Sequence, residues 1–225
     1  ITYACILKSC GSIAAADRGE QTHAEIVRAG LIGKFCVLDT ALVDMYAKCG
    51  WLEKAQQVFD ELPVRNVVLW TALIAGYAHI RKLEAVFSMF NKMAGEGVEP
   101  NLITFTVVLN ACSYLGLVEQ GRSYFEIMSE IYGITPTLGH RTCMVNLFAG
   151  SGHFDKAMEV IMRLPSSRYL PAWATLLGAC RKWENMKLGK LAFEYAVRLD
   201  NVRMSSVYST ADTQRYGNKI EAYMT

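Results

Sequence analysis

Apolar residues recur along the chain in a pattern that repeats about once every 31–36 residues. Within each period they fall at i, i+3, i+4 and i+7, as in an amphipathic helix, and a polar or glycine-containing break divides the period into two helices. The equivalent apolar anchors, spaced by 36, 31, 35, 36 and 32 residues, are Ile6, Leu42, Leu73, Val108, Met144 and Leu176. One helix pair cannot bury its apolar faces alone, so the pattern predicts an all-α solenoid of stacked helix-turn-helix repeats.

Proline and glycine mark the boundaries between these repeats. All five prolines lie at a boundary, where the missing N–H and the fixed backbone angle end one helix pair before the next begins. They are Pro63, Pro100, Pro136, Pro165 and Pro171. Gly30, Gly97 and Gly133 come just before a boundary, where a left-handed residue after a helix is expected.

Composition excludes several broad classes of protein. The 225 residues are 52% hydrophobic and 20% charged, which excludes wholesale disorder. Lys and Arg number 23 against 21 Asp and Glu, a net charge of +2, so a strongly polyanion-seeking protein is not expected. The apolar stretch 67–80 is too short to span a bilayer, and we expect no membrane partner. The chain begins at Ile1 without a signal-like segment, and we interpret it as part of a longer protein.

The seven cysteines do not indicate a metal or redox site, because no C-x2-C spacing occurs. Three of them, Cys10, Cys112 and Cys180, occupy the same position in their repeats. Other repeats have Tyr46 or Phe148 at that position. A place that accepts either Cys or an aromatic ring predicts buried, inert packing thiols. We therefore expect no metal and no cofactor.

Longer phrases of the sequence carry a family resemblance. VDMYAKCG (43–50) and VFDELP (58–63) resemble the short repeat of the pentatricopeptide repeat (PPR) family, in its plant organellar PLS class of long, short and standard repeats. LNACSYLGLVEQGRSYF and GITP resemble its last long repeat. HRTCMVNLFAGSGHFDKAMEVIMRLP followed by WATLLGACR resembles its last short repeat and the appended E motif.

This resemblance implies a right-handed α-solenoid and a division of the chain into seven segments. They are a long repeat at 1–35, a short one at 36–66, a standard one at 67–101, a long one at 102–137, a short one at 138–169, an E motif at 170–203 and a shortened E-plus-like helix pair at 204–225.

The resemblance also implies a function. Family members of this kind bind single-stranded RNA, one base per repeat, as site-recognition factors for cytidine-to-uridine editing in chloroplasts or mitochondria. The chain itself is then not an enzyme. A deaminase acts in trans or through a C-terminal domain missing here, and the expected protein partners are deaminase-domain proteins and multiple organellar RNA editing factors.

By the same resemblance, the fifth and the last residue of each repeat read the base. Thr40 with Asn66, and Thr71 with Asn101, imply two consecutive adenines, since hydroxyl and carboxamide groups both donate and accept hydrogen bonds. The later repeats offer less legible candidates for base reading, namely Thr106, Thr137 and Thr142. The alternative for Thr40 and Thr71 is an N-terminal helix cap, a place that threonine favours without RNA.

Other residues are implied to hold the base and the backbone of the RNA. Val37, Val68 and Ile103 are second residues of their repeats and are expected to sandwich bases, with ordinary packing between repeats as the alternative. Lys48 and His79 lie where the family contacts phosphate, and the alternative is a solvated surface side chain.

Rival interpretations remain open from the sequence. His23-Ala24-Glu25 matches the H-x-E half of a zinc deaminase motif, but the P-C-x-x-C half is absent from the sequence. A peptide-binding scaffold like that of tetratricopeptide repeats would use the same helix pairs, but it gives no reason for Thr and Asn at fixed places. A PPR factor for organellar RNA splicing or stability is a further alternative. Trp173, Trp183 and Tyr195, near the end of the chain, are interpreted as core residues rather than a protein interface.

Overall fold

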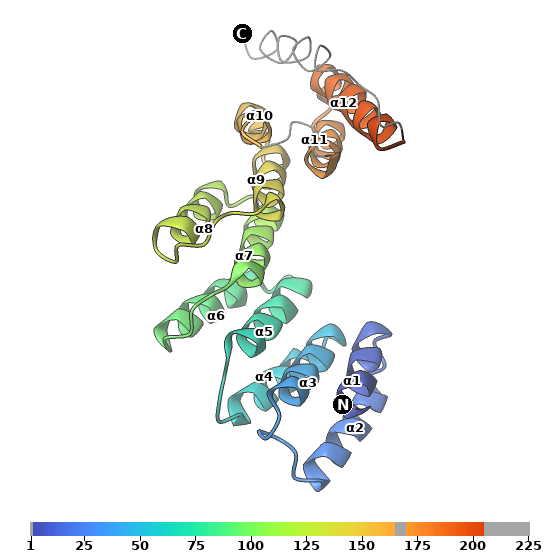
Figure 1. Ribbon diagram of the computed structural model, residues 1–225, viewed down its shortest axis with the longest axis vertical. Coiled ribbons are helices and arrows are strands. Elements are labelled where there is room, and N and C mark those ends of the chain that lie inside the picture. The colour runs from blue at the N-terminus through green and yellow to red at the C-terminus, as the bar shows by residue number, and fades with distance from the viewer. Residues whose placement is uncertain (1, 165–169, 205–225) are drawn as a thin grey trace. The chain divides into compact units, whose positions relative to one another are not determined.

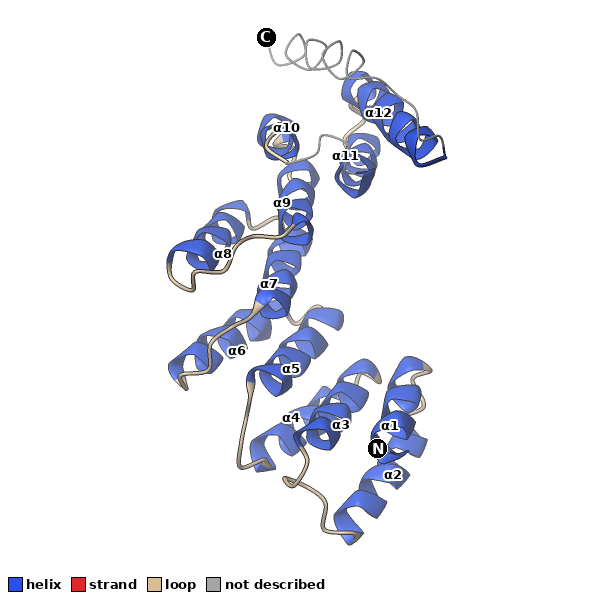
Figure 2. Cartoon of the chain, in the orientation of Figure 1, coloured by secondary structure: helices blue, strands red, loops and turns tan. Residues whose placement is uncertain are grey.

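The computed structural model describes residues 2–164 and 170–204, and every regular element within these ranges is an α-helix (Figure 2). The helices are α1 (Thr2–Ser12), α2 (Ala16–Arg28), α3 (Cys36–Lys48), α4 (Leu52–Glu61), α5 (Val67–His79), α6 (Leu83–Gly95), α7 (Leu102–Leu115), α8 (Val118–Glu130), α9 (Leu138–Gly150), α10 (Phe154–Met162), α11 (Leu170–Lys182) and α12 (Met186–Met204). The all-helical prediction is confirmed for this part of the chain. None of the helices described is long and apolar enough to cross a membrane.

The helices come in pairs, and each segment predicted between residues 1 and 203 holds one pair (Figure 1). Helix α12 continues to Met204, one residue beyond the predicted end of the E motif. The remainder of the predicted E-plus-like pair, residues 205–225, lies outside the described residues.

The chain divides into two compact units. The first holds residues 1–111 and 124–135, and in it α1 packs against α3 and α3 against α5, while α1, α3 and α5 also pack against α2, α4 and α6 (Figure 1). The second unit holds residues 112–123 and 136–225, and in it α9 packs against both α10 and α11, and α11 packs against α12. Within each unit, first helices therefore stack on first helices, as a solenoid requires.

The anchors predicted from the period form the core of these stacks. Leu42, Leu73, Val108 and Leu176 are fully buried and Met144 is 4% exposed. Ile6 is only half-buried, and its neighbour Leu7 takes the buried place instead. Burying each such side chain stabilises the fold by roughly 1.5–3 kcal/mol.

The thiols predicted to pack inside do so. Cys10, Cys112 and Cys180 are buried, and burial raises the pKa of Cys112 to about 12 and that of Cys180 to about 11. Cys5 and Cys36 are exposed, because they hold other places in their helices, so burial does not extend to every cysteine.

Each helix pair turns through a residue with left-handed backbone geometry. Counted from the first repeat to the last helix pair described, these residues are Ala14 (φ 53°), Gly50 (80°), Arg81 (60°), Gly116 (67°), Gly152 (82°) and Glu184 (55°). A second left-handed set ends the pairs at Gly30, Gly97 and Gly133, as the sequence predicted. Glycine adopts this geometry without the steric cost that a Cβ atom brings.

Candidate nucleic-acid interface

Three of the predicted base-reading residues are helix caps, namely Asn66, Asn101 and Thr137. The Asn66 Oδ1 atom accepts hydrogen bonds from the backbone N–H groups of Val68 (3.1 Å) and Leu69 (3.0 Å) at the start of α5. The Asn101 Oδ1 atom does the same for Ile103 (2.9 Å) and Thr104 (3.0 Å) at the start of α7. These bonds satisfy N–H groups that the first turn of a helix leaves without partners.

The threonines of the same pairs are not caps, so that alternative is wrong for both. Thr40 lies inside α3 and Thr71 lies inside α5, each in the second turn of its helix. Asn66 caps α5 and Asn101 caps α7, whereas α3 begins after Phe35 and has no side-chain cap.

Capping leaves each Asn side chain with only hydrogen-bond donors for other partners. Because its oxygen already accepts two backbone N–H groups, the group that remains is the Nδ2 amide, which only donates. The Asn66 Nδ2 atom lies against the Cys36 sulfur at the start of α3. The Asn101 Nδ2 atom has no hydrogen-bond partner among the described residues, and this side chain is half-buried.

The Thr71 hydroxyl is bonded inside the protein. This residue is 7% exposed, and its oxygen lies 2.7 Å from the Val67 carbonyl oxygen and 2.7 Å from the Thr104 hydroxyl. The Thr104 hydroxyl in turn donates to Asn101 Oδ1 (3.1 Å) and accepts from the Asn101 backbone N–H (3.2 Å). Thr71 and Asn101, the predicted pair of repeat 67–101, are therefore joined through Thr104.

The Thr40 hydroxyl has a different environment. Its oxygen is buried and has no hydrogen-bond partner among the described residues. Helix α5 packs against α3, and Leu69 holds in α5 the third place that Thr104 holds in α7. An apolar residue at that place leaves Thr40 without the partner that Thr71 has, so two repeats with the same Thr and Asn differ in their bonding.

The later candidates bond mainly to their own helices. The Thr106 hydroxyl donates to the Leu102 carbonyl oxygen (2.9 Å) and the Thr142 hydroxyl donates to that of Leu138 (2.9 Å). Thr137 precedes α9, where its hydroxyl lies 2.6 Å from His140 Nδ1. Thr106 belongs to the first compact unit, whereas Thr137 and Thr142 belong to the second.

The predicted base-sandwiching residues are exposed. Val37, Val68 and Ile103 are 67%, 52% and 64% exposed, and each is the second residue of α3, α5 or α7. Packing between repeats buries apolar side chains, so that alternative does not account for these three. An apolar side chain at one register of successive first helices offers a surface on which a base can stack.

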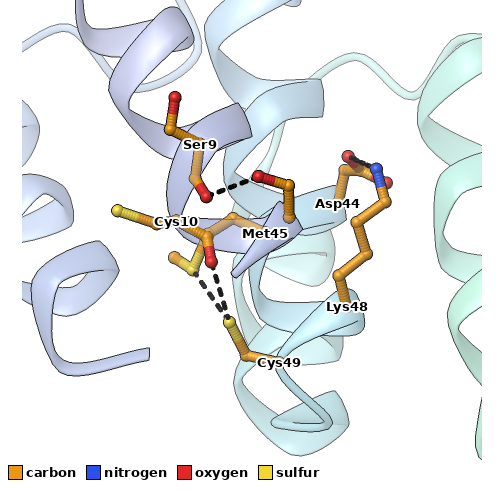
Figure 3. A network of polar contacts seen from close by, with 7 residues as sticks. Ser9, Cys10, Asp44, Met45, Lys48 and Cys49 are labelled. Carbon is orange, nitrogen blue, oxygen red and sulfur yellow. Dashed lines mark hydrogen bonds and ion pairs between the residues drawn. The ribbon is translucent and has the colours of Figure 1, made fainter. Parts of the chain in front are cut away.

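The predicted phosphate-binding lysine is engaged in an ion pair. The Lys48 Nζ atom lies 2.6 Å from Asp44 Oδ2, one turn earlier in α3 (Figure 3). Lys48 is exposed and Asp44 is half-buried, and a surface ion pair of this kind contributes about 0–1 kcal/mol, so its loss to a phosphate contact costs little. His79 is exposed at the last residue of α5.

The deaminase-like His23 has a structural partner. Its Nδ1 atom lies 2.9 Å from the buried Tyr46 hydroxyl, and burial lowers the pKa of His23 and raises that of Tyr46 to about 12. Within the described ranges, no three His, Cys, Asp or Glu side chains gather as metal ligands would.

The C-terminal aromatic residues divide between core and surface. Trp173 is fully buried and stacks on Tyr195 with 4.3 Å between ring centroids, as the core interpretation expects. Trp183 is 49% exposed, and its Nε1 atom donates to the Gly150 carbonyl oxygen (3.1 Å).

Sequence reasoning missed Thr104 and Asp44. The available signal for Thr104 is its polarity at a place where α3 and α5 carry leucine. The signal for Asp44 is its spacing of four residues from Lys48 on one helix face.

Comparisons with known proteins identify the repeats. The pattern of the PPR repeat family matches residues 65–113, and that of the PPR repeat matches 40–67, 103–131 and 141–169. A chloroplastic pentatricopeptide repeat-containing protein of Arabidopsis thaliana is 41% identical over 194 residues, covering 86% of this chain and 27% of its own length. The chain spans 25–40% of the length of the curated relatives it matches.

Solved structures share the fold. The pentatricopeptide repeat protein PPR10 from maize aligns with a TM-score of 0.65 at 16% identity, over 88% of this chain and 30% of its own. PPR10 in complex with an 18-nt psaJ RNA element aligns with a TM-score of 0.58 at 19% identity, over 92% of this chain and 36% of its own.

Proposed function

The chain belongs to the pentatricopeptide repeat family, and from this premise we propose that it binds single-stranded RNA and reads one base per repeat. The observation that carries the proposal is the Thr71–Thr104–Asn101 hydrogen-bond chain, which connects the fifth and the last residue of one repeat. Ordinary packing between helix pairs gives no reason for a polar chain at this place.

The hydrogen bonds of Thr71 and Asn101 favour bases with one particular arrangement of donor and acceptor on the Watson–Crick edge. The Thr71 proton is held by Val67 or Thr104, so its oxygen can only accept, while Asn101 Nδ2 can only donate. Adenine presents an amino donor beside a ring nitrogen acceptor on its Watson–Crick edge and therefore complements the pair. Cytosine shares this layout, whereas guanine and uracil carry an N–H donor on the corresponding ring nitrogen.

A base can reach the Asn101 side chain more easily than the Thr71 hydroxyl. Asn101 is half-buried and Thr71 is 7% exposed, so the carboxamide is the accessible member of the pair. Contact with the Thr71 oxygen requires the base to displace the side chains that cover it. The exposed Val68 and Ile103 side chains would then stack against the base and exclude water from these hydrogen bonds.

We further propose that the protein is a site-recognition factor for cytidine-to-uridine editing in a chloroplast or mitochondrion. In this role the chain supplies no catalysis, and a deaminase acts in trans or from another part of a longer chain. The support is the PLS-like order of repeats with an E-like end, together with a relative whose name places it in the chloroplast.

A specific surface favours protein partners at the C-terminal end. Met186, Phe193 and Val197 are 82%, 56% and 40% exposed and, spaced by seven and four residues, share one face of α12. Three exposed apolar side chains on one helix face are typical of a protein-docking surface. Editing-complex proteins, such as deaminase-domain proteins or multiple organellar RNA editing factors, are the proposed occupants.

Binding to short RNAs tests the proposal. We expect single-stranded RNA containing AA to bind more tightly than the same RNA containing UU, by about 1–3 kcal/mol for each matched base. The double variant Asn101→Asp with Thr71→Asn should move the preference of repeat 67–101 toward uracil. The Asp side chain still caps α7, so Asn101→Asp alone serves as a control in which the helix start is preserved. Equal binding of all homopolymers in a filter assay would contradict base reading.

A further inference from the structure

We propose that Thr104 is a positioning residue that sets the base preference of repeat 67–101, although it belongs to the following repeat. This inference rests on the proposed RNA-binding function and adds a residue to its specificity. Thr104 lies at the third place of α7, is fully buried, and so cannot touch a base itself. It acts through the two residues to which it is hydrogen bonded.

Both members of the reading pair are held by this one hydroxyl. The Thr104 oxygen lies 2.7 Å from that of Thr71, 3.1 Å from Asn101 Oδ1 and 3.2 Å from the Asn101 backbone nitrogen. A hydroxyl has one proton and two lone pairs, so these three contacts use its full capacity. The Thr104 hydroxyl therefore links the two reading groups, and the direction of its proton determines the direction of the Thr71 proton.

The proton arrangement follows from the acceptors present. If Thr104 donates to Asn101, it accepts from Thr71, and if Thr104 donates to Thr71, the proton of Thr71 goes to the Val67 carbonyl oxygen. In both cases the Thr71 oxygen has no proton left for a base and acts only as an acceptor. Without the Thr104 hydroxyl, both arrangements disappear, only the Val67 carbonyl oxygen still holds the Thr71 hydroxyl, and the link between Thr71 and Asn101 is lost.

The preceding repeat is a natural comparison without this hydroxyl. Repeat 36–66 has the same reading residues, Thr40 and Asn66, but the following helix carries Leu69 at the third place. The Thr40 hydroxyl is buried without a partner. Two repeats with one predicted preference should therefore discriminate bases to different extents, and repeat 67–101 should discriminate more strongly.

The test uses the complete chain and four RNAs that differ only at two adjacent nucleotides, AA, AU, UA and UU. The variants are Thr104→Val, which removes the hydroxyl at nearly constant shape, and Thr104→Ser, which keeps it. Asn101→Asp identifies which of the two nucleotides faces repeat 67–101. Thermal unfolding of each variant without RNA shows whether it is folded.

We expect Thr104→Val to lower the adenine-over-uracil preference about fivefold at the nucleotide identified by Asn101→Asp, which corresponds to one net hydrogen bond. The preference at the neighbouring nucleotide should not change, and Thr104→Ser should keep both preferences. The variant Leu69→Thr gives Thr40 a hydroxyl partner, so it should raise the adenine-over-uracil preference at that neighbouring nucleotide. It also provides a second test of the inference if Thr104→Val does not fold.

The outcomes separate this inference from the function on which it rests. A wild-type chain that binds all four RNAs equally contradicts the proposed function. A wild-type chain that prefers AA, together with a Thr104→Val variant that keeps both preferences, overturns only the role of Thr104. An equal loss at both nucleotides also overturns it, because a general structural defect would have that effect.

Discussion

At the scale of single residues, polar side chains at equivalent places have different bonding. Asn66 and Asn101 both cap a helix and keep only amide donors for other partners. Thr40 and Thr71 both lie in the second turn of a first helix, but only Thr71 has hydrogen-bond partners in the structure. The difference arises from the third residue of the next first helix.

A prediction on stability follows for Thr40. Replacing Thr40 by Val removes a buried hydroxyl that has no partner and keeps the shape of the side chain. We expect the free energy of unfolding to rise by about 1 kcal/mol. In the matched variant Thr71→Val, hydrogen bonds are lost and the free energy of unfolding should fall by about the same amount. Urea unfolding measures both, and equal destabilisation by the two variants would contradict the bonding described.

The sequence names candidate residues for base reading but does not predict their contacts. The Thr and Asn candidates could be named because they recur at fixed places in the repeats. The bond between Thr71 and Thr104 could not be predicted, because it joins residues 33 positions apart and depends on how two helices pack. The assignment of the helix caps to asparagine rather than threonine likewise needed the positions at which the helices begin.

At the scale of elements, the apolar period explains the helix pairs, and a residue with left-handed backbone geometry explains the turn within each pair. Apolar spacing predicted the helices because their stability depends on burying one face, and the buried Leu42, Leu73 and Val108 show that face. The left-handed residue between the helices of a pair recurs in every helix pair that the structure describes. The sequence gives no clear sign of it where the residue is Ala14, Arg81 or Glu184 instead of glycine.

Exchanging residues at this turn should change stability in opposite directions. Ala14 has a φ of 53°, and Ala14→Gly should raise the free energy of unfolding by about 1 kcal/mol by removing the Cβ strain. Gly50→Ala should lower it by a similar amount. A Cβ atom at Gly50 would meet no atom within 4 Å, so the effect there comes from the backbone alone. Calorimetric or urea unfolding checks both, and a neutral Gly50→Ala variant would refute the geometric argument.

At the scale of the whole molecule, stacked first helices within each compact unit repeat one set of surface places. Exposed apolar side chains recur at the second place of α3, α5 and α7, and the asparagine caps recur at the starts of α5 and α7. Lys48 and His79 are the two predicted phosphate contacts, and with so few the affinity for RNA should depend only weakly on salt. Recognition then depends on base edges rather than on the RNA backbone.

The most direct measurement of base reading is a selection from randomised single-stranded RNA against the purified chain. The bound pool should be enriched in two adjacent adenines at one fixed position relative to any other preferred bases. The enrichment should be sharper at the nucleotide that faces repeat 67–101 than at the one that faces repeat 36–66. A bound pool without any enriched dinucleotide, or one enriched in adjacent uracils, would contradict the account.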